Sequence, residues 1–272
     1  MNRKYATRVA AWRLMLTGLV TLGTAAACAP GDSGGSDGTD GEPAAGGRLT
    51  TSGAGDLLSR GFTPSEAQSR GLEALNRPAD GPPIEEVTID SLGVNFGLAE
   101  APLRMIEFFD YGCGYCRRFH KETRTLLHEQ YVDEGHVYWK SLPFIIGRWP
   151  ASVPVTLAAE CARDQGQDYF EAISGVIFEH QSDWKGADSP EELAEEYAAE
   201  AGLDMNRFRT CFANDEFLWR VQAQTAFAGN LGVRGTPTFL LVGFGPIQGA
   251  LPLETFQQVI DTMLVEVAAQ QP

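Results

Sequence analysis

The stretch FFDYGCGYCRRFH (108–120) places two cysteines, Cys113 and Cys116, three residues apart between an apolar run and a basic segment. The run before them, PLRMIEFFDY (102–111), is almost continuously apolar, which is typical of a strand covered on both faces. From 113 to 132 the apolar residues recur at helical spacing, with charges between them. The sequence therefore predicts a strand that leads into a helix, with the cysteine pair at the junction.

This position predicts different chemistry for the two sulfurs. At the start of a helix, Cys113 would meet unpaired backbone N–H groups and the positive end of the helix dipole, and both lower a thiol pKa. Cys116, one turn later, would lie deeper on the same side. We expect Cys113 to be the attacking sulfur and Cys116 the resolving one.

Two other interpretations of the pair are open. With Cys161 and Cys211 it could supply four thiolates to zinc, although these two cysteines are 50 residues apart and lack the usual close spacing. A purely structural disulfide between Cys113 and Cys116 is also possible, although so small a loop would add little stability.

The rest of the chain supports an α/β fold. Strand patterns are expected in 85–94, 136–144 and 235–243, and IQGAL (247–251) is the expected hairpin partner of the last of these. Between about 150 and 230 the pattern is helical, with breaks at Gly166, Gly186 and Gly202, and Ser189 begins a capping box. A final amphipathic helix covers 252–270. The predicted fold is a mixed sheet flanked by helices, in which the first strand–helix–strand unit is parallel, with an all-helical insertion.

The first 27 residues read as an export signal. Four basic residues precede the apolar segment 14–27, which ends in small residues and is shorter than the roughly 20 residues that span a bilayer. The small residues before Cys28 resemble a bacterial lipoprotein signal, and this resemblance implies lipidation of Cys28; simple cleavage after TAAA is the alternative.

The predicted domain organisation follows from this reading. Residues 28–62 would be the lipid-anchor cysteine and a flexible, glycine-rich tether, and 63–86 a short helix (63–76) and linker. The folded domain would cover 87–272.

Export also bears on Cys161 and Cys211, since disulfides persist outside the cytosol. They lie in two separate predicted helices of the insertion, and a structural disulfide between them is the simplest expectation. A second redox pair is the alternative.

The segments EFFDYGCGYCRRFH (107–120) and LGVRGTPTF (231–239), with the helical insertion between them, resemble the DsbA-type branch of the thioredoxin superfamily over about 90–270. The resemblance implies a thioredoxin-like mixed sheet and a redox role for Cys113 and Cys116, with Gly114 and Tyr115 as the dipeptide that tunes the potential. It also implies a loop at Thr236 and Pro237 whose proline is cis and which binds extended substrate through its backbone.

Glu107 matches the buried glutamate of that family. A carboxyl group on the core side of the strand would have a raised pKa and could relay the proton of Cys116. An ordinary strand residue is the alternative. Asp110 is expected in the turn at the strand end, and His120 is expected to be a solvated or packed histidine.

Composition restricts the partners. Without the four basic residues of the signal, 17 basic residues stand against 36 acidic ones, a net charge of −19. This argues against nucleic acid as a partner. We expect the substrates to be exported proteins with thiols or disulfides, and a membrane redox partner to recycle the pair. The protein itself is expected to be a monomer in the cell envelope or periplasm, attached to the membrane through Cys28. No cofactor or metal is expected beyond the redox-active disulfide.

The direction of exchange is less constrained than the chemistry. Gly114-Tyr115 and the threonine before Pro237 resemble bacterial disulfide isomerases, but those proteins carry an N-terminal dimerisation domain, and here we expect only a tether and one short helix before the folded domain. The prediction is therefore an oxidase, with isomerase or reductase as alternatives. A non-catalytic, anchored binding module on a thioredoxin scaffold is an alternative of a different class.

Overall fold

The computed structural model describes residues 73–83 and 86–270. The predicted signal (1–27), Cys28 and the tether (28–62) lie outside the described residues. The helix predicted over 63–76 overlaps them only at its end, where Glu73 and Ala74 are helical.

Five strands form one mixed sheet in the order β1-β3-β2-β4-β5. Their bounds are β1 Val94–Phe96, β2 Leu103–Phe109, β3 Val137–Pro143, β4 Thr238–Leu241 and β5 Gly245–Gln248. As predicted, β2 and β3 are parallel and β4 and β5 are an antiparallel hairpin. The antiparallel pairs β1–β3 and β2–β4 complete the sheet, so β2 lies between β3 and β4.

A helical run of alternating α-helical and π-helical turns connects β2 to β3. Its segments are α4 Gly114–Phe119, the π-helical η3 His120–Arg124, α5 Thr125–Leu127 and the π-helical η4 His128–Val132. This confirms a helical connection over the predicted range, but the sequence pattern did not predict the π-helical turns.

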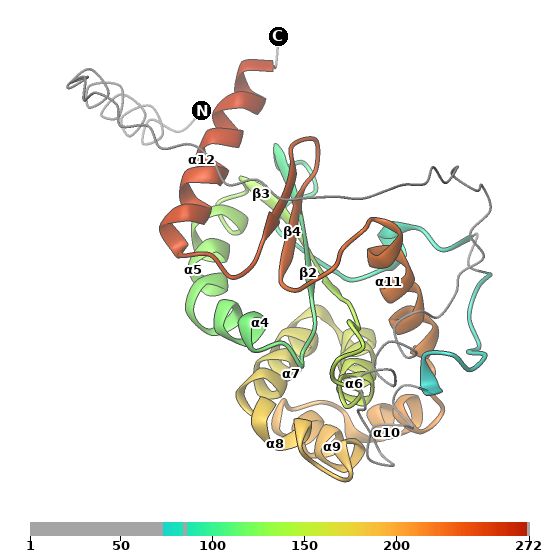
Figure 1. The fold of residues 1–272 in the computed structure, drawn as a ribbon. Coiled ribbons are helices and arrows are strands. Elements are labelled where there is room, and N and C mark those ends of the chain that lie inside the picture. Colours follow the sequence, from blue (N-terminus) through green and yellow to red (C-terminus); the bar gives the residue numbers. More distant parts are fainter. Residues whose placement is uncertain (1–72, 84–85, 271–272) are drawn as a thin grey trace, which may run out of the picture. The chain divides into compact units, whose positions relative to one another are not determined.

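Six helices follow β3, and one ends the described chain. They are α6 Ser152–Gln165, α7 Gln167–Glu179, α8 Gln181–Lys185, α9 Pro190–Glu200, α10 Met205–Ala213, α11 Leu218–Asn230 and α12 Leu253–Gln270. In Figure 1, α4, α5 and α12 lie on one side of the sheet and α11 on the other, while α6 to α10 gather beyond the end where β2 leads into α4. The helical insertion therefore lies next to the cysteine pair.

Successive side chains along β2 point to opposite faces of the sheet, and each face carries an apolar core. Phe108 points to one face and packs in a cluster that includes Ala223 and Ala228 of α11. On the opposite face, Phe119 of the first helical run packs against Trp139 of β3 and Phe239 of β4, with ring centroids 6.3 and 4.6 Å away. Phe108 and Phe119 are almost completely buried, so the strand before the cysteines and the helix after them are both fixed by packing.

The strand predicted over 85–94 is wrong for most of its length. Residues Ile89–Ser91 form a 3₁₀ turn, and the strand begins only at Val94. The physical reason lies in the hydrogen bonds: Arg163 and Lys140 side chains donate to the carbonyls of Ser91 and Leu92, which are therefore not in a strand ladder.

The helix start predicted at Ser189 is correct, since α9 begins at Pro190. The predicted cap is not formed, because within the described part of the chain the Ser189 side chain makes no capping hydrogen bond. Here proline at the first helical position and the acidic residues of the first turn remain as the signals for helix formation.

Across residues 73–83 and 86–270, no helix is both long enough and apolar enough to cross a membrane.

Candidate redox site

Three chain segments meet at the cysteine pair. β2 ends at Phe109, and after a short turn Cys113 is the N-cap residue of α4. Because β4 pairs with β2, with Phe108 opposite Thr238, the residues just before β4 lie beside Cys113. The Thr236–Pro237 peptide bond there is cis, and the Cys113 thiol donates to the Thr236 carbonyl oxygen at 3.2 Å. The sheet register thus brings together two sequence segments more than 120 residues apart.

Cys113 is an acidic thiol. Its pKa is lowered from 9.0 to about 6, chiefly by a hydrogen bond from the Cys116 thiol. Burial opposes the change, while contacts with Thr236 and the backbone N–H groups of Tyr115 and Cys116 add to it. The sequence predicts the helix N-terminus as the cause of the lowered pKa, but the Cys116 thiol contributes more than those N–H groups do.

Cys116 is the opposite case. It is 1% exposed, and burial raises its pKa well above 9.0, with the hydrogen bond to Cys113 and the charge of Cys113 acting in the same direction. Both cysteines are free thiols in this structure. Two identical side chains one helical turn apart therefore have pKa values shifted in opposite directions, which suits an attacking and a resolving sulfur.

Glu107 lies on the same face of the sheet as Trp139 and is 4% exposed. Trp139 Nε1 and Ser141 Oγ each donate to its carboxylate at 3.1 Å. Burial raises its pKa, while the charge of Arg124 and the two hydrogen bonds act against this. The carboxyl also lines a small cavity of about 10 Å³ together with His120, Arg124 and other side chains. The arrangement provides a buried group that can take up and release a proton.

Asp110 forms the turn between β2 and the cysteines. Its carboxylate accepts hydrogen bonds from the backbone N–H groups of Gly112 (2.8 Å) and Ile146 (3.0 Å) and from the Ser152 hydroxyl (2.6 Å). Burial raises its pKa to about 6 despite these bonds, and the charge of Cys113 also raises it. Asp110 is thus a turn residue, as predicted from the sequence, and is also electrostatically linked to Cys113.

His120 is packed. Its ring lies 4.7 Å from that of Phe178, and burial lowers its pKa to about 3. The ring is therefore neutral at physiological pH and supplies no positive charge to the thiolate.

Gly114 and Tyr115 form the outward face of the pair. Both are exposed, and the Tyr115 side chain is 62% exposed with the Arg118 guanidinium 5.1 Å from its ring centroid. A Cβ at Gly114 would meet no atom within 4 Å, so space for a docked chain remains above this residue.

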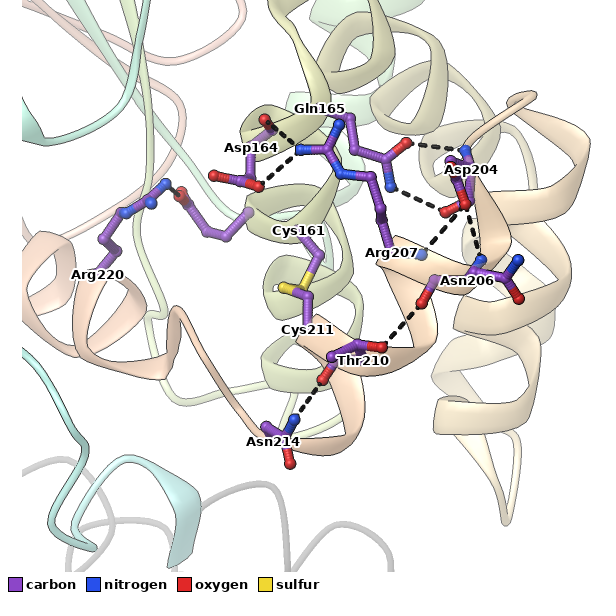
Figure 2. Close-up of a disulfide and its surroundings, with 11 residues drawn as sticks. Cys161, Asp164, Gln165, Asp204, Asn206, Arg207, Thr210, Cys211, Asn214 and Arg220 are labelled. Carbon is purple, nitrogen blue, oxygen red and sulfur yellow. Dashed lines mark hydrogen bonds and ion pairs between the residues drawn. A yellow bond between two sulfur atoms is a disulfide. The ribbon is translucent and has the colours of Figure 1, made fainter.

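The structure joins Cys161 of α6 to Cys211 of α10 in a disulfide. Figure 2 shows that it is one of several links between these elements. Arg207 pairs with Asp164 at 3.1 Å, and the Gln165 side chain exchanges two hydrogen bonds with the backbone of Asp204. The disulfide leaves neither cysteine as a thiolate for the alternative zinc site, and in the described chain there is no group of three or more side chains that could hold a metal ion.

Sequence reasoning missed several neighbours of the pair. Ser152, Gln181 and Lys185 come from the helical insertion, and each bonds to the Asp110–Cys113 turn. No local motif marks them, because their roles depend on how the insertion packs against the end of β2.

The model of the family described as Thioredoxin matches residues 92–262, which include every strand but exclude the N-terminal region. The chain belongs to this thioredoxin family. The matched segment contains the cysteine pair, the cis-proline loop and the whole helical insertion.

Curated relatives of this thioredoxin-family protein are of two kinds. It is 31% identical over 147 residues to the Na(+)/H(+) antiporter NhaA 3 of Salinispora tropica, a match that covers 54% of this chain and 21% of the antiporter. The chain thus spans about a fifth of the length of that relative. It is 28% identical over 157 residues to the probable disulfide bond formation protein D of Bacillus anthracis, which covers 55% of this chain and 69% of that protein.

Solved structures agree with the fold. The crystal structure of oxidised BdbD from Bacillus subtilis has a TM-score of 0.57 at 19% identity and covers 65% of this chain and 95% of that one. Wolbachia pipientis alpha-DsbA1 has a TM-score of 0.60 at 20% identity, covering 68% and 97%. These similarities confirm the DsbA-like thioredoxin fold with its helical insertion.

Proposed function

We propose that this protein is a thiol–disulfide oxidoreductase that exchanges disulfides with exported proteins through Cys113 and Cys116, and that it acts as an oxidase. One observation carries the proposal: the acidic thiol of Cys113 lies against the cis-proline loop, while the adjacent Cys116 thiol is buried and holds its proton. The similarity to a probable disulfide bond formation protein supports the same chemistry.

The reaction begins with the oxidised pair. A substrate thiolate attacks the Cys113 sulfur, the Cys113–Cys116 bond breaks, and Cys116 leaves as a thiolate that takes up a proton. A second substrate thiolate then attacks the substrate sulfur of the mixed disulfide and expels the Cys113 thiolate. Two electrons pass from the two substrate thiols to the pair, so a substrate disulfide forms as the pair is reduced. An external two-electron acceptor, proposed to be a membrane redox partner, must reoxidise the pair.

Glu107 is proposed as the proton relay for Cys116. The leaving Cys116 thiolate needs a proton in a buried site, and in the reverse step that proton must be removed. The Glu107 carboxyl, with its raised pKa, is buried on the sheet face against which the first helical run packs. The carboxyl also lines the small cavity described above, together with His120 and Arg124.

Substrate would lie across the exposed Gly114 and Tyr115 and along the loop at Thr236 and Pro237. In this structure the Thr236 carbonyl accepts a hydrogen bond from the Cys113 thiol. An extended substrate that bonds to the backbone of the loop would compete with the thiol for this carbonyl. Neither the oxidised sulfur nor the Cys113 thiolate has an S–H to donate, so in both forms the carbonyl is free for substrate.

The direction of exchange is tested by the reduction potential of the Cys113–Cys116 couple, measured by equilibration with glutathione. The low pKa of Cys113 stabilises the reduced form and so favours an oxidant. An oxidase predicts a value near roughly −120 mV, whereas a value near roughly −270 mV would identify a reductant and overturn the direction. An intermediate value, with activity on scrambled disulfides, would favour the isomerase.

The non-catalytic binding module is separated by activity. We expect the protein to catalyse insulin reduction and the oxidative refolding of a reduced substrate. Inactivity in both assays, with a metal co-purifying, would favour the binding module instead.

Export and anchoring are a separate proposal, supported by the basic, apolar and small-residue order of 1–27 followed by Cys28. The domain would be held in the cell envelope by a lipidated Cys28 and the tether. Replacement Cys28→Ser should move the protein from the membrane fraction to the soluble extracellular or periplasmic fraction and abolish fatty-acid labelling. Unchanged membrane association without labelling of the wild type would contradict the anchor.

A further inference from the structure

The turn that delivers Cys113 to α4 is held by a five-residue helix of the insertion. Gln181 and Lys185, the first and last residues of α8, are four positions apart and so lie on one face of the helix. The Gln181 side-chain amide donates to the carbonyl oxygens of Tyr111 (2.5 Å) and Cys113 (3.0 Å). The Lys185 ammonium donates to the carbonyl between them, Gly112, at 2.7 Å. Three consecutive carbonyls are therefore satisfied by two side chains.

These three carbonyls need partners from outside the sheet. β2 ends at Phe109, so the ladder to β3 and β4 does not extend to them. The Cys113 carbonyl already accepts the Arg117 N–H of the first helical turn at 3.1 Å, and Gln181 occupies its second lone pair. Gln181 is almost completely buried, which means that its amide has exchanged water for this contact.

Lys185 is held in place from its other side as well. Its ammonium lies 4.8 Å from the centroid of the Trp149 ring. Trp149 itself packs against the turn so tightly that a Cβ at Gly112 would lie 2.6 Å from the Trp149 Cβ. Trp149 and α8 therefore both contact the turn, and the Lys185 ammonium lies next to both.

The placement brings a positive charge to the redox pair. Burial lowers the pKa of Lys185, while the negative charges of Asp110 and Cys113 act to raise it, so the ammonium attracts both groups. Because this attraction is mutual, the ammonium should favour the anionic form of Cys113, whose charge in turn raises the pKa of Asp110 on the same turn. Cys116, whose thiol bonds to Cys113, stays protonated, and His120 is neutral, so neither supplies a positive charge.

We propose that Gln181 and Lys185 are positioning residues through which the helical insertion fixes the backbone of Cys113 and stabilises the negative charge of its sulfur. This inference rests on the proposed function, since it concerns the same thiol–disulfide exchange. It gives the insertion a role in setting the oxidising strength of the pair, in addition to any contact with substrate.

The test compares Lys185→Met and Lys185→Arg with Lys121→Met. Lys121 makes a surface ion pair with Glu179, so its replacement changes the net charge equally but removes no contact of the turn. The equilibrium constant between the oxidised protein and reduced glutathione is measured for each, together with the pH titration of the Cys113 thiolate by its ultraviolet absorbance.

We expect Lys185→Met to lower the equilibrium constant by roughly three- to tenfold, equivalent to a fall of about 15–30 mV in the reduction potential. The thiolate titration of Cys113 should move to higher pH, and the effect should shrink at high salt. Lys185→Arg should retain most of the wild-type value, and Lys121→Met should retain all of it. Gln181→Leu leaves the charge in place. It should lower the melting temperature, but it should shift the Cys113 titration less than Lys185→Met does.

The inference would be overturned if Lys185→Met melts as a folded protein and yet has the wild-type equilibrium constant with glutathione and the wild-type titration of the Cys113 thiolate. If Lys185→Met fails to fold, Lys185→Gln removes the charge and keeps a polar side chain, and the same two measurements apply. A wild-type protein that does not equilibrate with glutathione would refute the proposed function instead, and the thiolate titration would still decide whether Lys185 acts on Cys113.

Discussion

At the residue scale, environment sets the chemistry of the site. Cys113 and Cys116 have the same side chain, yet one pKa falls to about 6 and the other rises well above 9.0. The sequence predicted the direction for Cys113 because the strand-to-helix junction was readable from the apolar pattern. It could not predict that the Cys116 thiol contributes more than the helix N–H groups, since that depends on the rotamers of two side chains.

Glu107 was predicted as a buried carboxyl, and the structure places it in such a site with two neutral donors. Its raised pKa has a consequence for stability. Protons bind the folded state more tightly than the unfolded state, so the contribution of Glu107 is fully present below the unfolded pKa of about 4.5 and is lost as pH rises through the folded pKa.

Glu107→Gln should therefore flatten the pH dependence of stability. We expect the variant to gain free energy of unfolding relative to wild type as pH rises above about 4.5, because only the wild type loses the contribution of its protonated carboxyl. Urea denaturation at a series of pH values measures this. Asp110 also has a raised pKa but is present in both proteins, so it does not affect the difference. A difference that is constant with pH would contradict the account of Glu107.

At the element scale, the turn from β2 to α4 is the decisive feature. Its existence was predicted from the change of apolar spacing around Cys113, and the position of the last strand hairpin from the GTPTF segment. The start of the first strand was misplaced because the carbonyls of Ser91 and Leu92, just before it, accept hydrogen bonds from the side chains of Arg163 and Lys140, which lie far along the chain. The π-helical turns between His120 and Val132 were not predicted either, because apolar spacing does not distinguish them from an α-helix.

The disulfide between α6 and α10 belongs to this scale. It closes a loop of 50 residues, so removing it should cost roughly 4 kcal/mol of unfolding free energy on the chain-entropy model. The double variant Cys161→Ala, Cys211→Ala should show this loss in urea denaturation and retain disulfide exchange at Cys113.

Asp164→Asn is a matched comparison within the same contact. It removes the exposed ion pair with Arg207 shown in Figure 2 and should cost less than about 1 kcal/mol. A double cysteine variant no less stable than Asp164→Asn would show that the disulfide does not hold the insertion together. Loss of exchange at Cys113 in a folded double variant would instead favour the second redox pair.

At the scale of the whole molecule, the fold class followed from the order of elements. A parallel strand–helix–strand unit, a helical insertion and a terminal hairpin with a helix were all readable from the sequence. What could not be read is how the insertion meets the sheet. The contacts of Gln181 and Lys185 with the cysteine turn join residues about 70 positions apart and leave no local pattern.

The two redox forms should differ in global stability with pH. In the reduced protein the folded state lowers the pKa of Cys113, so this contribution is present above the unfolded pKa of about 9 and is lost as pH falls through about 6. The oxidised protein has no such thiol. We therefore expect the reduced form to gain about 1 kcal/mol relative to the oxidised form between pH 6 and pH 7 or slightly above.

Melting of both forms at each pH measures this difference, and contributions from Glu107 and Asp110 largely cancel because both forms contain them. A reduced form that loses stability relative to the oxidised one as pH rises from 6 would be inconsistent with an acidic Cys113.

The most direct test of the central claim is the rate of alkylation of Cys113 in the reduced wild-type protein as a function of pH, with the modified cysteine identified by mass spectrometry. We predict a titration midpoint near pH 6 for Cys113 and no labelling of Cys116 in the folded protein over the same range. A midpoint near roughly 8.5, the value of an ordinary cysteine, would contradict the account of this site as a redox centre.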